Sequence, residues 1–495
     1  MEQLLEKSPA EQLDYFLGFT SGDPMGESRE GLLETIGLAA AADPRWAVGL
    51  LQSLAAHGAW ESDIWSTIFW KVPLASLPTE AQEWTLSDLV APLSGESRTR
   101  YALSQFLFAK VLVSAERDLD AKVLEKLLQA SLTLWRAEHA AGDSRPPDDF
   151  AKTDWVLKAI NLTSGQIVEF WLRYTQKCAA GVRGFDGWPA EIAPEMDLIA
   201  KGEKPADWES LAILGRHLDF VRAVAGTWTR QRLYSWFDFA QRNEGAWILW
   251  RSFVGYGNFN RDLILELPPY FAKVFGLLAT ADEDWVERFS TYVAVIVFSG
   301  LWDVTSGDWL QSFLLALSPK LRANFAAALG RSIRDIAADS ARKLWRQWMH
   351  AYWQERLNGR PVPLTAEENG EMAAWLWPLP ADEFAAGVSL LLQGPEPTAG
   401  DPMLILERTF KGHVLSAQPT ACLALLRWLL QFRKHYYGEK REFQDLLKQL
   451  PRDPALGNEW LKICHELALL GTSWAGELSD EGKAHFQGPA TDSAV

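Results

Sequence analysis

Tryptophan near the start of expected helices is the feature of this sequence that most restricts its fold. Of the 495 residues, 25 are tryptophan, and many follow an acidic residue closely. These combinations are Asp43 with Trp46, Asp63 with Trp65, and the pairs Asp154-Trp155, Asp207-Trp208, Asp284-Trp285 and Asp308-Trp309. An acidic residue stabilises the first turn of a helix, and an indole just inside it can anchor the helix on its neighbour. The pattern indicates a large helical protein and says nothing of chemistry.

Several helix starts are marked by a capping residue followed by proline, which loses no helical hydrogen bond at the first position. These pairs are Ser8-Pro9, Asp43-Pro44, Ser318-Pro319, Asp401-Pro402 and Asp453-Pro454. A glutamate three residues after a serine or threonine adds a capping box at Ser8, Thr280 and Thr365. Each of these positions predicts the beginning of a helix.

Between these starts the apolar residues recur at helical spacing, as in Trp309, Leu310, Phe313, Leu314 and Leu317. The β-branched run from Val293 to Phe298 is the one rival strand, and its helical flanks favour a helix. We therefore expect an all-α protein, an irregular α-solenoid of stacked antiparallel helix pairs of the HEAT-like or TPR-like kind.

Interruptions in the helical pattern suggest how the chain is organised. Residues 141–149, 181–205 and 394–402 are rich in Pro, Gly or Asp, and the tail from about 476 is polar. We expect an N-terminal helical-repeat region at 1–180, a C-terminal one at 181–475, and a disordered tail at 476–495.

Charge and cysteine content limit the classes of partner. The formal net charge is −16, which repels phosphate backbones, so nucleic acid is an unlikely partner. Three isolated cysteines fit a reducing compartment better than a disulfide framework. No secretory signal is evident at the N-terminus, and the longest uncharged apolar stretch, Phe289 to Trp302, is short of the roughly 20 residues that cross a bilayer. We expect a cytoplasmic protein that does not enter the membrane.

No motif with a catalytic or ligand-binding role stands out. The eight histidines are scattered, and Cys464-His465-Glu466 resembles the start of a zinc-protease helix whose second histidine position is Leu469. Gly255 and Gly257 imitate a dinucleotide loop but follow a helical pattern, where that loop requires a preceding strand. The sequence predicts no catalytic, cofactor or metal residue, and hence a protein that is not an enzyme.

A local basic run is the main candidate for a docking surface. Arg331 to Arg360 contains seven basic residues against three acidic ones. The simpler interpretation is the solvated back of helices whose fronts are apolar. The alternative is a surface that binds an acidic partner, through Arg342, Arg346 and Arg356. Adjacent tryptophans in Trp375-Leu376-Trp377-Pro378 cannot share one helical face, so Trp377 joins these arginines as a candidate partner-binding residue.

Certain segments resemble the helical region that follows sirtuin-type NAD-consuming domains in bacterial anti-phage defence proteins. The clearest runs from Leu344-Trp345-Arg346-Gln347-Trp348 through Tyr352-Trp353-Gln354-Glu355-Arg356 and Gly359 to Pro361-Val362-Pro363-Leu364, followed by Glu368, Met372 and Trp375. Earlier stretches around 60–65, 154–171 and 229–238 are similar, so the likeness extends over most of residues 30 to 470. These motifs are structural signatures, and no catalytic residue is transferred from them.

The resemblance implies a function that composition alone does not. In those proteins a sirtuin-type domain precedes this region, whereas Met1 stands here almost directly in the helical part. We therefore expect a stand-alone or truncated form, or an effector on a separate chain. The resulting hypothesis is a non-enzymatic sensor or scaffold that recognises a phage protein or a separate NAD-consuming effector. The alternatives are an enzyme that processes nucleotides or nucleic acid at an interhelical site, and a housekeeping protein-binding scaffold.

Overall fold

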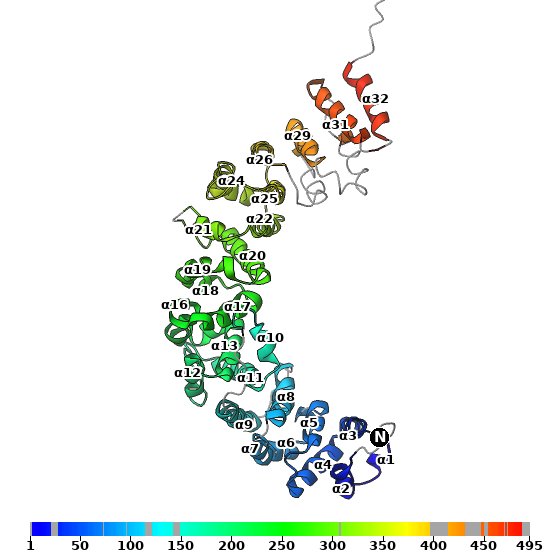
Figure 1. The fold of residues 1–495 in the computed structure, drawn as a ribbon, viewed down its shortest axis with the longest axis vertical. Coiled ribbons are helices and arrows are strands. Elements are labelled where there is room, and N and C mark those ends of the chain that lie inside the picture. Colours follow the sequence, from blue (N-terminus) through cyan, green and yellow to red (C-terminus); the bar gives the residue numbers. More distant parts are fainter. Residues whose placement is uncertain are drawn as a thin grey trace, which may run out of the picture. The chain divides into compact units, whose positions relative to one another are not determined.

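The computed structural model describes most of the chain. The described residues are 2–20, 28–72, 74–95, 97–113, 121–141, 149–305, 308–396, 414–430, 447–449, 454–469, 471–472 and 474–487. Regular structure in these ranges is helical throughout and includes no strand. The all-α helical-repeat fold expected from the sequence is confirmed, and Figure 1 shows the succession of helices along the chain.

The chain divides into two compact units, Met1–Leu263 and Ile264–Val495. This division differs from the expected regions 1–180 and 181–475, because α11 (Thr163–Ala179) and α13 (Pro205–Arg216) pack on each other across the glycine-rich stretch that suggested a boundary. The helices of unit 1 are α1 (Glu2–Leu5), α2 (Pro9–Gly18), α3 (Arg29–Ala42), α4 (Pro44–His57), α5 (Asp63–Lys71), α6 (Thr79–Trp84), α7 (Val90–Leu93), α8 (Ser97–Val113), α9 (Ala121–Ala140), α10 (Trp155–Ile160), α11 (Thr163–Ala179), α12 (Ala193–Lys201), α13 (Pro205–Arg216), α14 (Leu218–Val224), α15 (Gly226–Trp228), α16 (Phe239–Arg242) and α17 (Ala246–Tyr256).

Unit 1 is built as a continuous row of packed helices. Along the row α3 contacts α5, α5 contacts α8, α8 contacts α11, α11 contacts α13, and α13 contacts α17. Intervening helices such as α4, α9 and α10 pack against members of this row. Most of these helices bury apolar residues against their neighbours, which is the arrangement of helical-repeat proteins.

Unit 2 is also built from helices that pack on one another in succession. The chain enters it through α18 (Arg261–Glu266), and its helices are α19 (Pro268–Phe275), α20 (Glu283–Ser299), α21 (Trp309–Ala316), α22 (Pro319–Ile333), α23 (Ala338–Leu344), α24 (His350–Leu357), α25 (Ala366–Met372), α26 (Ala381–Gln393), α28 (Val414–Ala417), α29 (Pro419–Leu429), α31 (Gly457–Leu469) and α32 (Trp474–Gln487). The succession of contacts runs from α20 to α22 to α25, and from α24 through α26, α29 and α31 to α32.

Most of the testable helix starts lie where the sequence places them. Ser8, Asp43 and Ser318 are N-caps ahead of proline, and Thr365 caps α25. Thr280 is different: it ends a short 3-10 turn, and Asp282 caps α20 by accepting from the Trp285 backbone N–H. Asp401, Pro402 and Asp453 lie outside the described residues.

Four of the tryptophans near helix starts donate a hydrogen bond to the connection that precedes their helix. The Nε1–H of Trp65 donates to the Ala59 carbonyl at 2.8 Å, that of Trp208 to Gly202 at 2.9 Å and that of Trp309 to Asp303 at 3.0 Å. Each acceptor lies six residues before its donor, and Trp155 makes a similar bond to Phe150. These indoles therefore anchor the helix and satisfy a carbonyl of the preceding connection at the same time.

Two further expectations can be compared with the structure. Residues 293–298 are helical within α20, as predicted. The expectation of a disordered tail from 476 is wrong for residues 476–487, because α32 extends to Gln487. Residues 488–495 lie outside the described part of the chain. None of the described helices is both long and apolar enough to cross a membrane.

Candidate functional site

The connection between α24 and α25 in unit 2 is held by one arginine. Arg356, in the last turn of α24, donates from Nη1 to the Arg360 carbonyl at 3.3 Å and also to the Val362 carbonyl. Gly359 takes φ +80° in this connection, a left-handed conformation that favours glycine. Arg356 thus fixes the path of the Gly359-Arg360-Pro361-Val362 segment.

Glu368, on α25, holds the Arg356 side chain in place. Its carboxylate accepts from Arg356 Nε at 2.9 Å and from Arg356 Nη2 at 2.6 Å, a bidentate geometry. The two side chains are 1% and 0% exposed. Thr365 Oγ1 accepts from the Glu368 backbone N–H at 3.2 Å, so the helix cap forms while the carboxylate points to Arg356. The capping-box glutamate therefore serves a tertiary contact.

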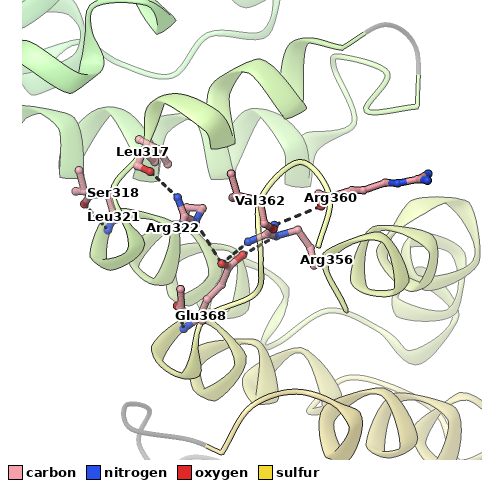
Figure 2. Close-up of polar contacts among 9 residues, drawn as sticks. Leu317, Ser318, Leu321, Arg322, Arg356, Arg360, Val362 and Glu368 are labelled. Atoms are coloured by element: carbon pink, nitrogen blue, oxygen red, sulfur yellow. Dashed lines mark hydrogen bonds and ion pairs between the residues drawn. The ribbon is translucent and has the colours of Figure 1, made fainter. Parts of the chain in front are cut away.

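A second buried arginine shares the same carboxylate. Arg322, on α22, lies with Nε 3.5 Å from Glu368 Oε2 and donates from Nη1 to the Leu317 carbonyl at 2.6 Å. Figure 2 shows Arg322 and Arg356 approaching Glu368 from opposite sides, while the Arg360 side chain extends away. Two guanidinium groups and one carboxylate leave the cluster with an excess of positive charge.

Tyr352 adds a hydroxyl to this cluster. Its oxygen is buried, and burial raises the pKa of Tyr352 far above its usual value, so the hydroxyl stays protonated. The neighbouring Arg356 opposes that rise in pKa. The tyrosine therefore contributes a neutral O–H donor beside two permanent cations.

A pocket opens next to the cluster between α21 and α24. Its volume is about 280 Å³, and its lining is Val304, Thr305, Asp308, Leu310, Gln311, Leu314, Trp348, Ala351, Tyr352, Glu355, Arg356, Arg360 and Pro361. The lining combines apolar and aromatic side chains with amide, carboxylate and guanidinium groups. Such a mixture is typical of small-ligand sites, in which apolar walls supply contact and few polar groups orient the ligand.

The aromatic side of the pocket is the edge of a buried cluster. Trp348 lies with its ring centroid 5.8 Å from Tyr352 and 6.1 Å from Trp375. Trp375 in turn contacts Trp353 at 5.8 Å and donates from Nε1 to the Ala326 carbonyl at 2.9 Å. The tryptophan-rich segment is therefore a packed core element that presents one face, through Trp348, to the pocket.

The four predicted partner-binding residues do not form one surface. Arg342 pairs with Asp339 at 2.8 Å and with Asp382 at 3.1 Å, and Arg346 pairs with Asp382 and Glu383 of α26. Trp377 is partly exposed and Trp375 is buried. Arg356 is buried, so its assignment to a surface patch is corrected: it lies on the apolar face of α24 and holds the connection to α25.

The residues of the weaker sequence motifs lie in or at the end of helices. Cys464 lies inside α31, where burial raises the pKa of its thiol to about 12, and burial does the same for Cys422. Gly257 directly follows the last residue of α17, so the glycine pair belongs to a helix end. Groups of three or more potential metal ligands do not occur among the described residues.

Sequence reasoning singled out Arg356 and missed its partners. Tyr352 and Glu368 belong to the tryptophan-rich motif without a role predicted for their side chains, and Arg322 lies outside that motif. One signal was available: Arg322 stands between Leu321 and Ala323 on a helix whose apolar positions surround it, which is unusual for a solvated arginine.

Comparison with known protein families gives a match in unit 2. Residues 295–453 match the model of a family described as a domain of unknown function, DUF4020. This range contains the charge cluster and the pocket. No curated protein and no solved structure matches the chain.

Proposed function

We propose that this chain is a non-enzymatic sensor or scaffold of a bacterial anti-phage defence system. In this proposal it recognises a phage protein or a separate NAD-consuming effector through the surface of its stacked helices. The motivating observation is the resemblance of residues 344–364, and of earlier segments, to the helical region of sirtuin-fused defence proteins. The NAD-consuming activity belongs to the effector in this scheme, and no catalytic residue is assigned here.

Exposed apolar side chains support a protein partner. Trp70 in unit 1 is 54% exposed, Leu157 in unit 1 is 55% exposed and Leu315 in unit 2 is 58% exposed. When a partner covers large apolar residues that are exposed to water, the free energy of the complex is lowered. Rows of packed helices present such residues over an extended area, which suits recognition of another protein.

A sensor also has to transmit binding energy to its effector. Binding at one place changes the affinity at another only when the two ligands favour different states of the protein. We therefore expect the phage protein and the effector to affect each other's affinity for this chain by the same factor. Measuring both affinities, each with and without the other ligand, gives a direct test of this reciprocity.

The cellular experiment uses the complete gene neighbourhood. Cells carrying this gene together with a neighbouring NAD-consuming effector are infected, and NAD is measured over time. We expect NAD to fall only when both genes are present. Loss of NAD with the effector alone, at the same rate and with the same dependence on infection, would contradict the proposal.

A binding experiment connects the proposal to the surface. Leu157→Glu and Leu315→Glu place a charge in each exposed apolar position, and Gln347→Glu adds the same charge at an exposed polar position. We expect at least one leucine variant to weaken effector or phage-protein binding roughly tenfold, about 1.4 kcal/mol, with little effect of the control. Equal binding by all three variants would remove these surfaces from the proposal.

A second candidate function is an enzyme with a site between helices. The specific observation that favours it is the mixed polar and aromatic pocket between α21 and α24. Incubating the purified chain with NAD or nucleic acid, with and without divalent metal, tests this candidate. Turnover that is lost in Tyr352→Phe and retained in Gln347→Glu would favour an enzyme over a scaffold.

A further inference from the structure

The buried charge cluster of unit 2 contains more positive than negative charge. Arg322 and Arg356 are 8% and 1% exposed, and both lie against the single buried carboxylate of Glu368. Among the described residues, Glu368 is the only carboxylate at ion-pair distance from either guanidinium. Backbone carbonyls of Leu317, Arg360 and Val362 accept from the two arginines but carry no full charge. An additional anion nearby would balance the cluster.

Two donors in this cluster are also incompletely satisfied. The Nε–H of Arg322 is buried and lies 3.5 Å from Glu368 Oε2, without the geometry of a hydrogen bond. The hydroxyl oxygen of Tyr352 is buried as well, and its O–H has no acceptor there, although Arg356 lies beside it. Buried donors without acceptors are uncommon in folded proteins and often mark a position that a water or ligand fills. Tyr352 lines the pocket, so an acceptor in the pocket can reach it.

The apolar lining and the volume of the pocket indicate the character and size of the ligand. Leu310, Leu314, Trp348 and Pro361 are apolar members of the lining, and Trp348 is 6% exposed. The volume of about 280 Å³ accommodates a compact organic molecule and is too small for a nucleic acid or a folded domain. An apolar or planar group would pack on these residues while the polar end of the ligand faces Tyr352 and Arg356.

Acidic residues of the lining do not cancel the positive charge of the cluster. Glu355 is exposed and lies 3.5 Å from the exposed Arg360. Asp308 is exposed at the start of α21. Water and salt screen exposed charges much more than buried ones. The buried arginines therefore dominate the field at the inner end of the pocket.

We propose that the pocket between α21 and α24 binds a compact organic carboxylate with an apolar or aromatic body. The carboxylate accepts from the Tyr352 O–H and faces the positive charge of Arg356, with Arg360 at the exposed side. The carboxylate belongs either to a free small acid or to the C-terminus of a peptide. This inference does not depend on the proposed defence function.

Three probes of one shape test the charge of the ligand. Benzoate, benzamide and benzamidine share a phenyl ring and differ in carrying a negative, neutral or positive group. Isothermal titration calorimetry on the full chain should detect benzoate and show at least tenfold weaker binding of the other two. Equal binding of benzamide, preference for benzamidine, or no binding of benzoate overturns the proposal.

Variants assign the binding to this pocket. Tyr352→Phe removes only the hydroxyl, and we expect it to weaken benzoate binding about tenfold, the effect of one hydrogen bond to a charged group. Arg360→Gln should weaken it less, because that side chain is solvated. Arg346→Gln removes an exposed arginine outside the pocket lining and should leave binding unchanged. Unchanged binding in Tyr352→Phe, with circular dichroism matching the parent chain, overturns the assignment.

A peptide series distinguishes the two sources of the carboxylate. A short peptide ending in phenylalanine is compared in its free-acid and amidated forms. Tighter binding of the free acid than of benzoate identifies a peptide C-terminus as the ligand type. Exclusion of both peptides while benzoate binds identifies a small acid. Equal binding of the free-acid and amidated peptides contradicts carboxylate recognition.

Discussion

Arg356 and Glu368 form a bidentate ion pair that joins the end of one helix to the beginning of the next. The two hydrogen bonds measure 2.9 and 2.6 Å, and the side chains are 1% and 0% exposed. Burying two charges costs solvation free energy, which the pair recovers only when its geometry is good. We therefore infer that the pair fixes the position of the α24–α25 connection and adds little net stability.

Removing one member of this pair is expected to destabilise unit 2 strongly. Arg356→Met keeps most of the side-chain volume but leaves Glu368 facing Arg322 alone and frees the carbonyls of Arg360 and Val362. We expect a loss of about 3–5 kcal/mol in the free energy of unfolding. Denaturant titration followed by circular dichroism measures it.

The control for this prediction is an exposed ion pair elsewhere in unit 2. Arg342→Met breaks contacts with Asp339 and Asp382, which are exposed, and should change the free energy of unfolding by at most about 1 kcal/mol. A double variant, Arg356→Met with Glu368→Leu, should not restore the stability of the parent, because it leaves the buried Arg322 without a carboxylate. Equal effects of Arg356→Met and Arg342→Met would refute the assigned role of the buried pair.

A tryptophan near a helix start should contribute through its indole N–H as well as its packing. Trp208→Phe removes the bond from Nε1 to the Gly202 carbonyl and part of the contact with Phe150 at 5.1 Å. We expect a loss of about 1–3 kcal/mol in unfolding free energy. Trp70→Phe is the matched control, because Trp70 is 54% exposed, and should lie within about 0.5 kcal/mol of the parent. Similar losses in both variants would show that the indole bond adds nothing.

Local patterns in the sequence were sufficient to predict the fold class. Asp43 and Ser318 mark helix starts because a cap involves residues only a few positions apart. The same locality explains the failure at Thr280, where Asp282 offers a competing cap two residues later. The unit boundary was not predictable in this way, since it depends on which helices pack together across the glycine-rich stretch at 181–205.

The candidate site depended on contacts that no local pattern contains. Arg356 follows Trp353 by three positions and Tyr352 by four, so it falls on the apolar face of its helix, yet its charge suggested a solvated surface. Arg342 and Arg346 also pair with Asp382 and Glu383 of α26, about forty residues later. Glu368 serves two arginines from different helices, which only the packed structure reveals.

Paired acidic residues should prevent Arg342 and Arg346 from acting as a polyanion-binding surface. Asp382 lies 3.1 Å from Arg342 and 3.6 Å from Arg346, and Glu383 also contacts Arg346. In a chain with net charge −16, such neutralised arginines attract polyanions weakly. We expect the double variant Arg342→Glu with Arg346→Glu to elute from heparin at the same salt concentration as the parent. Clearly earlier elution would restore the docking-patch interpretation.

Asp207 should make the stability of unit 1 depend on pH. It is 1% exposed, accepts from the backbone N–H groups of Glu203 and Lys204, and lies 3.2 Å from His139. Burial raises the pKa of Asp207 from 3.8 to about 6, while His139 and the backbone bonds oppose that rise. At pH values between 3.8 and about 6, Asp207 therefore keeps its proton in the folded chain but has released it in the unfolded chain.

The sign of the effect follows from proton linkage. Because the folded state binds more protons in this window, the contribution of Asp207 to stability falls as pH rises from about 4 to about 6 and is constant above that range. Asp207→Asn removes the titration, so the unfolding free energy of the parent minus that of the variant should decrease by about 1–3 kcal/mol across the window. Denaturant titrations at pH 4, 5, 6 and 7 measure this difference, with Asp339→Asn as the exposed control. A difference that stays constant, or that rises with pH, would mean that burial does not control the ionisation of Asp207.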